Sequence, residues 1–345
     1  MRIAMLTVQD APGWREVHVT GLSGALTALG HDVTVHHQPP DLPETQLGRY
    51  VDELRSEWES ARPEVVHAHF WRPGLAAVLA AQPSGVPVVQ SFHGLGGGRD
   101  QRAGVERLVG REAALVVATC EQEMLDLAAA GIPRRRIALA SRGVDVGLFE
   151  SHGTTAERSE LQRIVTVADP LADNGLTDLV TALPRLPRVE LVIAGALSAG
   201  EADRVRRWAH RLGVEKRVQL AGSVGRAELP ALLRSADVVA CVPAQATWDA
   251  LPLEAMACGV PVVATAVGGL TDAVIDGVTG VLVPPHDVKQ LVRKLRMVLD
   301  DETFRITCGI AGVDRVHARH TWPDAARGVE RLYRQLLATP VPSRR

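Results

Sequence analysis

The sequence predicts an α/β protein built from two doubly wound parallel sheets that follow one another along the chain. Three observations predict this: the length of 345 residues, two successive series of short apolar runs that alternate with helix-like stretches, and a polar segment between the series. A chain of this length exceeds what one hydrophobic core usually supports, so two domains are expected. Apolar strands that alternate with amphipathic helices are typical of parallel sheets covered on both faces.

The predicted strands are runs of apolar and β-branched residues bounded by turn residues. In the first half they are Arg2–Val8, Asp32–His37, Val65–His69, Pro87–His93, Leu115–Cys120 and Ile137–Ala140. In the second half they are Ile164–Ala168, Glu190–Gly195, Val218–Gly222, Val238–Pro243, Pro261–Ala266 and Gly280–Pro284. Helical periodicity predicts a helix over Val17–Leu29 and a last one over Trp322–Leu337.

The domain boundaries follow from a polar stretch, Glu150–Glu160, which lacks apolar periodicity and contains several turn residues. We therefore expect an N-terminal domain over residues 1–150, a linker over 151–162 and a C-terminal domain over 163–320. The last predicted helix occupies residues 321–338.

Composition excludes several classes of function. A net charge of -2 argues against a nucleic-acid partner, because phosphate binding needs a concentrated basic face. The four cysteines lie far apart without metal-ligand spacing, so we expect neither a disulfide framework nor a zinc site, and a cytoplasmic location. The apolar N-terminal run is too short to span a membrane, so no integral membrane segment is expected.

The most specific motif is Trp248–Val263, in which an apolar, small-residue helix contains Glu254 and ends through Gly259 into a strand. Gly268–Leu270 and Asp276–Pro284 follow it. In the first half, comparable motifs are Gly30–Val33, His67–Trp71, Ser91–Gly96 and Gly143–Asp145. Together these motifs resemble the family-4 glycosyltransferases from about Arg2 to Leu336. The resemblance implies the GT-B fold, two Rossmann-like domains that face a cleft, with the last helix crossing back to the first domain.

By this resemblance, the first domain lies on the acceptor side and the second binds a nucleotide sugar. Glu254 would bind the ribose hydroxyls, and the backbone of Leu251, Pro252 and Leu253 would contact the pyrophosphate. Ser223 and Val224 would border the nucleobase. His93 would lie beside the transferred sugar.

Several positions depart from the family's pattern. A second glutamate, eight residues before Glu254, is replaced by Ala246, and a glycine of the same motif by Asp249. An arginine and a lysine that would hold the diphosphate are replaced by Asp169 and Asn174. Losing two charge-assisted hydrogen bonds could cost roughly 3 to 6 kcal/mol of donor affinity. A remodelled donor site is therefore expected.

Arginines from the first domain are candidates to replace those cations, because a guanidinium fork binds phosphate well. Arg99 stands where relatives carry a lysine and Arg142 where they carry an asparagine; Arg15 and Arg72 are weaker candidates. Gly13 belongs to the loop after the first strand, where the family's Gly-Gly becomes Gly13-Trp14, and is expected to contribute to the donor site.

Two histidines and a glycine-rich loop of the first half are further candidates. His93 ends a strand before a glycine-rich loop, which favours a functional role, whereas His67 alternates with His69 along a strand and is interpreted as buried and hydrogen-bonded. Gly94–Gly98 is not a dinucleotide fingerprint, because Arg99 stands at the last glycine position and the loop follows the fourth strand.

The predicted function is transfer of a sugar from a nucleotide-activated donor to an unidentified acceptor, with retention of configuration, in a specialised pathway. No cofactor is expected beyond the nucleotide sugar as co-substrate. No metal is expected either, because the sequence has no Asp-x-Asp pair to hold a divalent ion against a diphosphate. The alternatives are a non-catalytic GT-B protein that binds or activates a partner, and another GT-B chemistry such as epimerisation or phosphorolysis. The sequence leaves open a homodimer or a partner protein.

Overall fold

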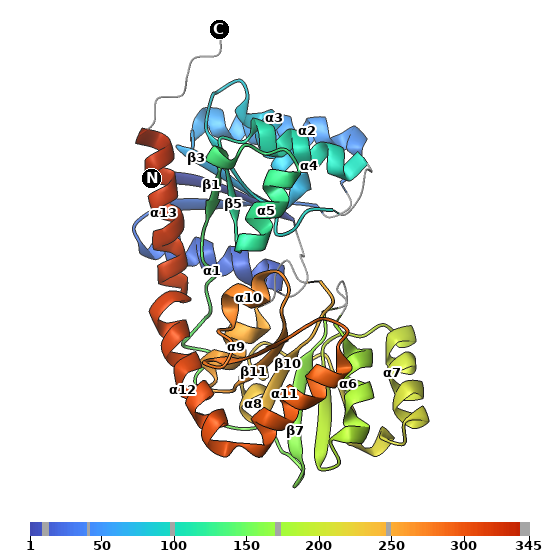
Figure 1. Ribbon diagram of the computed structural model, residues 1–345. Coiled ribbons are helices and arrows are strands. Elements are labelled where there is room, and N and C mark those ends of the chain that lie inside the picture. The colour runs from blue at the N-terminus through green and yellow to red at the C-terminus, as the bar shows by residue number, and fades with distance from the viewer. Residues whose placement is uncertain (9–13, 40–41, 97–100, 170–173, 246–249, 339–345) are drawn as a thin grey trace. The chain divides into compact units, whose positions relative to one another are not determined.

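The computed structural model describes residues 1–8, 14–39, 42–96, 101–169, 174–245 and 250–338 (Figure 1). The predictions made for Gly13, Arg99, Ala246 and Asp249 lie outside these residues. The chain divides into two compact units, and each is described by itself.

Unit 1 contains residues 1–143 and the chain from 322 onward, and is built on one six-stranded parallel sheet of order β2-β1-β3-β4-β5-β6. The strands are β1 (Arg2–Val8), β2 (Asp32–Gln38), β3 (Val65–His69), β4 (Val88–Ser91), β5 (Leu115–Ala118) and β6 (Ile137–Leu139). The helices are α1 (Trp14–Ala28), α2 (Glu44–Ser60), α3 (Trp71–Ala81), α4 (Gln101–Glu112), α5 (Glu121–Ala129) and α13 (Trp322–Ala338).

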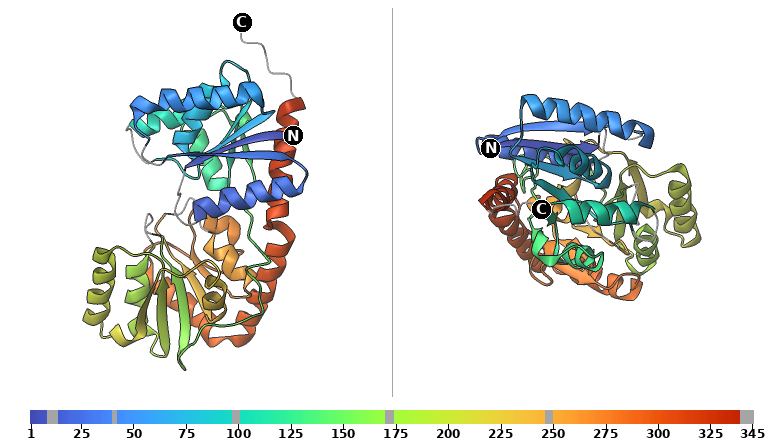
Figure 2. Two further views of the ribbon diagram at one scale, coloured as in Figure 1. Left: turned by 180° about the vertical axis from the view of Figure 1, so that it is seen from behind. Right: turned by 90° about the horizontal axis from the view of Figure 1, so that it is seen from above.

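Helices cover both faces of this sheet, as Figure 2 shows for α1 and α2. Successive residues of a strand point to opposite faces. Accordingly, Ala4 and Leu6 join one core with α2 and α3, whereas Ile3 and Met5 join another with α1 and α13. The strands therefore read as continuous apolar runs because both of their faces are buried.

Unit 2, residues 144–321, repeats this plan with a second six-stranded parallel sheet of order β12-β11-β10-β7-β8-β9. Its strands are β7 (Gln162–Val167), β8 (Val189–Ala194), β9 (Val218–Gly222), β10 (Val238–Cys241), β11 (Val262–Thr265) and β12 (Gly280–Val283). Its helices are α6 (Leu176–Ala182), α7 (Ala199–Arg211), α8 (Leu229–Arg234), α9 (Leu251–Ala257), α10 (Gly269–Ala273), α11 (Val288–Asp300) and α12 (Glu302–Arg319).

The predicted fold class, two parallel sheets with helices, is confirmed. Strand ends differ by a few residues, most clearly at β4, which was predicted as Pro87–His93 and observed as Val88–Ser91. Proline has no N–H to give to a sheet, and His93 leaves the extended conformation with a φ of 57°. β4 therefore ends early, and its following residues form the start of a loop.

No helix in the described part of the chain has the length and apolar character needed to cross a membrane. The four cysteines are all buried, and none of them forms a disulfide.

Candidate functional site

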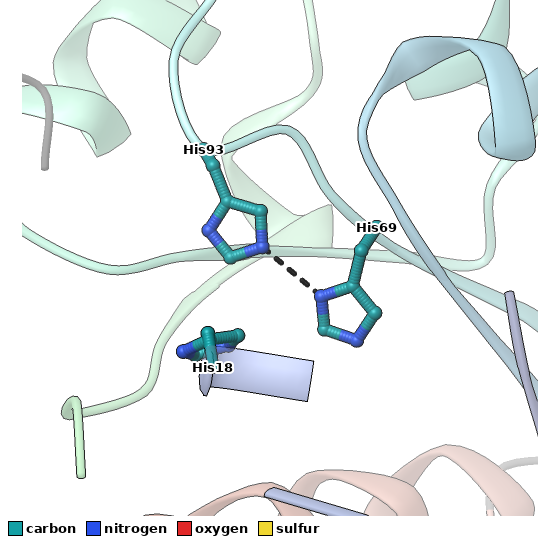
Figure 3. Close-up of side chains that lie close together, drawn as sticks. All are labelled: His18, His69 and His93. Carbon is teal, nitrogen blue, oxygen red and sulfur yellow. Dashed lines mark hydrogen bonds between the residues drawn. The ribbon is translucent and has the colours of Figure 1, made fainter. Parts of the chain in front are cut away.

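Three imidazoles meet at the carboxyl-terminal edge of the unit 1 sheet, and we call them the histidine cluster: His18, His69 and His93 (Figure 3). His18 lies on α1, His69 is the last residue of β3, and His93 follows the end of β4. The Nδ1 atom of His69 is hydrogen-bonded to Nε2 of His93 at 3.0 Å. The ring of His18 lies 4.8 Å from that of His93, centre to centre, in an edge-on arrangement.

Burial keeps the imidazoles of His18 and His69 neutral. It lowers the pKa of His18 to about 3, with a further contribution from the positive charge of Arg142. Burial also holds the pKa of His69 well below its ordinary value, helped by the neighbouring histidines. A neutral His69 can donate or accept through Nδ1 according to its tautomer, so it can fix which nitrogen of His93 carries a proton.

The backbone at this edge adopts an uncommon conformation. His93 has a φ of 57° and Phe70, which follows His69, has a φ of 69°. Such values in residues with a side chain typically cost about 1 to 3 kcal/mol and cluster at functional sites. The two rings lie 5.0 Å apart, so the strained segments contact each other. This geometry supports the functional role that the sequence predicted for His93.

His67 has a structural role, as its position on the strand indicated. It is buried, and its ring nitrogens contact Tyr333 Oη at 2.6 Å and Ser91 Oγ at 2.9 Å. Burial lowers the pKa of His67 to about 3 and raises the pKa of Tyr333. These bonds connect β3 and β4 to α13, and His67 stacks on His69 with ring centres 4.4 Å apart.

A buried carboxylate organises the loops beside the cluster. Glu123 on α5 accepts hydrogen bonds from the backbone N–H groups of Gly94 at 3.0 Å and Thr119 at 2.7 Å. The Thr119 hydroxyl also donates to Glu123 and accepts from Arg142 at 3.1 Å. Arg142 is therefore placed beside the histidine cluster, and its charge is partly balanced through Thr119.

The cluster also has the composition of a metal site, since one ring nitrogen from each histidine lies within 4.8 Å of the others. Neutral imidazoles are good ligands for transition metals. Two observations count against a resident ion. The His69–His93 hydrogen bond uses one ring nitrogen of each, and the charge of Arg142 that disfavours protonated His18 also repels a metal cation. We therefore treat the cluster as a hydrogen-bonding site.

In unit 2 the central feature is an ion pair between Glu254 and Arg226. Glu254 lies in the first turn of α9 and is buried, and its Oε1 accepts from Arg226 Nη1 at 2.6 Å. Burial raises the pKa of Glu254, and the charge and hydrogen bond of Arg226 oppose that shift. The Arg226 side chain is 35% exposed and its guanidinium lies 4.7 Å from the centre of the Phe149 ring. Arg226 thus links a buried carboxylate to the surface.

The predicted phosphate cradle has fewer donors than its position suggests. The side chains of Leu251, Pro252 and Leu253 are buried at the start of α9. Pro252 has no N–H, so this turn offers one donor fewer than three consecutive amides would. Val224 is half-buried against the same core as Leu251, and Ser223 beside it is exposed.

Asp169 and Asn174 bond to each other across a loop. The backbone N–H of Asp169 donates to Asn174 Oδ1, and Asn174 Nδ2 donates to the Asp169 carbonyl, both at 2.8 Å. Gly175 follows with a φ of 63°, and a Cβ there would lie 1.9 Å from the carbonyl oxygen of Val242. Only glycine therefore fits at position 175, directly before α6.

Sequence reasoning missed Arg226, His18 and His69 as site residues. Arg226 stands 28 positions before Glu254, and no spacing rule connects them. His18 sits on a helix whose periodicity explains it as an ordinary buried residue. The weaker candidate Arg72 is exposed at the start of α3, with its guanidinium 5.2 Å from the centre of the Trp71 ring.

Two parallel α/β units, each with polar residues at the carboxyl ends of its strands, define the class of GT-B-like proteins. Solved structures agree on the fold. Sucrose-phosphate synthase from Thermosynechococcus elongatus superimposes with a TM-score of 0.86 at 23% identity, over 98% of this chain and 99% of that one. Anabaena HepE in complex with UDP and glucose gives 0.80 at 19% identity, over 97% and 100%.

Sequence comparisons identify the family. Residues 15–143 match the glycosyl transferase 4-like domain, and residues 150–314 match the glycosyl transferases group 1. D-inositol 3-phosphate glycosyltransferase of Mycobacterium tuberculosis is 30% identical over 328 residues, which cover 86% of this chain and 67% of that relative. The chain belongs to the family-4 glycosyltransferases of the GT-B fold.

Proposed function

We propose that this glycosyltransferase takes its sugar from a nucleotide-activated donor and transfers it to an acceptor hydroxyl with retention of configuration and without a metal ion. Unit 2 holds the nucleotide, with Glu254 at the ribose and Ser223 and Val224 beside the base. Unit 1 provides His93 for the sugar. The reaction forms a bond from the acceptor oxygen to the anomeric carbon. The bond to the diphosphate breaks, its electron pair leaves with the nucleoside diphosphate, and the hydroxyl proton passes to that leaving group.

The Arg226–Glu254 pair is the observation that carries this proposal. A carboxylate is an acceptor for two adjacent hydroxyls, and a guanidinium at 2.6 Å fixes its orientation. The half-exposed guanidinium also places positive charge near the start of α9, where the family motif lies. Two relatives support the donor class: the HepE structure contains UDP and glucose, and the mycobacterial relative is a glycosyltransferase.

Arg142 is our candidate to stabilise the charge that develops on the leaving diphosphate. It stands at the carboxyl edge of unit 1, near enough to the histidine cluster for its charge to add to the burial that lowers the pKa of His18. Preorganised positive charge of this kind replaces the metal ion of other sugar transferases. A cytosolic location and a role in specialised metabolism belong to the same proposal.

A second candidate is a non-catalytic GT-B protein that binds a partner. The observation that favours it is the Asp169–Asn174 pair, since both residues are engaged with each other where the family places cations for the diphosphate. A protein of this kind would not bind nucleotide diphosphates tightly.

A nucleotide panel separates the two candidates. Purified protein is titrated calorimetrically with nucleoside diphosphates and nucleotide sugars. We expect one base to bind in the micromolar range, and Glu254→Ala to weaken that binding by at least about tenfold, because each bidentate hydroxyl contact is worth more than 1 kcal/mol. Glu215→Ala, an exposed carboxylate of the same unit, is the matched control and should bind normally. A panel without binding favours the non-catalytic protein.

A further inference from the structure

A cavity of about 440 Å³ lies within unit 1, and we call it the α3–α4 pocket after the helices that form most of its wall. Its apolar lining includes Leu47 on α2, Trp71 and Leu75 on α3, and Val105 on α4. Its size falls within the range of sites for small organic ligands, which is roughly 300 to 1,000 Å³. The pocket therefore suits a compact molecule.

The pocket and the histidine cluster share the carboxyl-terminal edge of the same sheet. Gln38 ends β2, Trp71 follows the end of β3, and α4 follows the loop after β4. Trp71, Leu75 and Val105 also pack against the apolar cluster that contains Phe92, the residue before His93. One wall of the pocket is thus continuous with the core that supports the start of the loop after β4.

The polar lining residues indicate what chemistry the ligand carries. Gln38 is buried at 3% exposure, and its side-chain oxygen has no hydrogen-bond partner. A buried carbonyl without a donor costs free energy, so a ligand hydroxyl that donates to Gln38 is favoured.

The charged lining residues are both cationic. Arg72 and Arg102 line the pocket, and no acidic residue does so among the described lining residues. Arg102 donates through Nε to Glu106 at 2.8 Å, and Glu106 is itself buried and bonded to the Gly96 N–H. That pair uses one of the five N–H donors of the guanidinium. The pocket therefore favours an anionic group over a cationic one.

We propose that the α3–α4 pocket is the acceptor site, and that the acceptor is a hydroxylated, ring-containing organic acid. The ring system contacts Leu75, Val105 and Trp71, the acid group lies near the arginines, and a hydroxyl donates to Gln38. A free sugar fits less well, because the wall is mainly apolar and Gln38, Gln101, Arg72 and Arg102 offer partners to only some of its hydroxyls. This inference deepens the proposed function and rests on it for the word acceptor, but the binding site is testable by itself.

The test measures binding to the purified full chain without any nucleotide, with 6-hydroxy-2-naphthoate as the probe. Its fluorescence reports saturable binding. We expect 2-naphthol, which lacks the acid, to bind about tenfold more weakly, since a charged hydrogen bond is lost. The analogue 2-naphthoate, which lacks the hydroxyl, should bind severalfold more weakly, and methyl glucoside should not compete.

Variants locate the site. Val105→Glu fills the pocket with a negative charge and should reduce probe affinity by at least about tenfold. Leu125→Glu, at an exposed leucine on α5 of the same unit, is the matched control and should leave binding unchanged. Arg102→Gln changes a half-exposed side chain and should abolish the preference for 6-hydroxy-2-naphthoate over 2-naphthol. This variant keeps the proposal testable even if Val105→Glu fails to fold.

The proposal is overturned if Val105→Glu leaves probe affinity unchanged and Arg102→Gln leaves the preference for the acid unchanged, or if methyl glucoside binds as tightly as the probe. Failure here is distinguishable from failure of the proposed function, because the nucleotide panel tests unit 2 and this titration contains no nucleotide. A protein that binds nucleotides but no aromatic acid remains a sugar transferase with a different acceptor.

Discussion

The two units share a topology, but the candidate functional side chains at the ends of their strands differ in charge. Each has a six-stranded parallel sheet with functional candidates just after its strands. In unit 1 these candidates are imidazoles, of which His18 and His69 are held neutral by burial. In unit 2 the candidate is a buried carboxylate whose charge is supported by Arg226. The comparison teaches that the strand edge fixes where polar groups gather, while burial and partners decide their charge.

The largest expected difference between the units is in their response to acid. His18 and His67 are neutral in the folded state, with pKa values near 3, but titrate near 6.5 when unfolded. Between those values the unfolded chain binds more protons, so unit 1 loses stability as the pH falls below 6.5. The slope is about 1.4 kcal/mol per pH unit for each such histidine.

Glu254 in unit 2 has the opposite sign, because its folded pKa is raised. The folded state takes up that proton first, so unit 2 gains stability from Glu254 as the pH falls through the raised pKa. Hydrogen exchange from pH 7 to pH 5, with EDTA present, should show unit 1 opening first. His18→Leu should reduce the slope in unit 1, and His152→Gln, at an exposed histidine, should not. Equal loss of protection in both units would contradict the assignment.

The next largest effect concerns His69, which we regard as a positioning residue for His93. Removing its ring in His69→Ala frees His93 to take another tautomer or orientation, and misplacement of a catalytic group can cost about 100-fold in rate. We expect kcat of sugar transfer to fall by that order with a smaller change in donor KM.

The variant His69→Asn tests the same contact more gently, because its amide can occupy a place near that of Nδ1. It should recover part of the lost kcat. A His69→Ala enzyme that loses only stability, with normal kcat, would show that His69 merely fills the core.

A smaller effect is expected at the ion pair of unit 2. Arg226→Gln keeps a hydrogen-bond donor but removes the charge and the contact with Phe149. With its cation gone, burial alone should raise the pKa of Glu254 further, and the protonated carboxyl accepts hydroxyl donors less well. We expect nucleotide affinity to fall by about tenfold at pH 7 and to fall less at higher pH. Calorimetry at two pH values checks this, and an identical loss at both would argue against the mechanism.

The sequence was sufficient for the sheet architecture, and the reason is local. Runs such as Val65–His69 are apolar on both faces, and a parallel strand is the element that needs this. His93 was predicted as a site residue because it ends a predicted strand before glycine. Its partners could not be found in the same way: the hydrogen bond to His69 spans 24 positions, and His18 reaches the cluster from α1. Such contacts depend on sheet order and helix packing, which no local pattern records.

The α3–α4 pocket shows the same limit more strongly. Its lining comes from β2, α2, α3 and α4 and from the chain between β2 and α2, and none of these segments has a distinctive motif on its own. The residue Gln38 reads as an ordinary polar strand end, and its significance comes from burial without a partner. Donor-site positions such as Ser223 and Val224, by contrast, were nominated by resemblance, and ligand binding has still to test them.

The smallest expected effect concerns Tyr333, whose hydroxyl contacts His67 next to the histidine cluster. Tyr333 on α13 contacts His67 Nδ1 at 2.6 Å, and both side chains are buried. Tyr333→Phe removes the hydroxyl, keeps the ring, and leaves that nitrogen without its partner, which should cost about 1 kcal/mol. Urea unfolding should detect this loss in unit 1 with an unchanged slope, while nucleotide binding by unit 2 stays normal. His67 stacks on His69, which contacts His93. If the fall in kcat, expressed as activation free energy, exceeds the loss of unfolding free energy, Tyr333 on α13 influences the position of His93 through these two histidines.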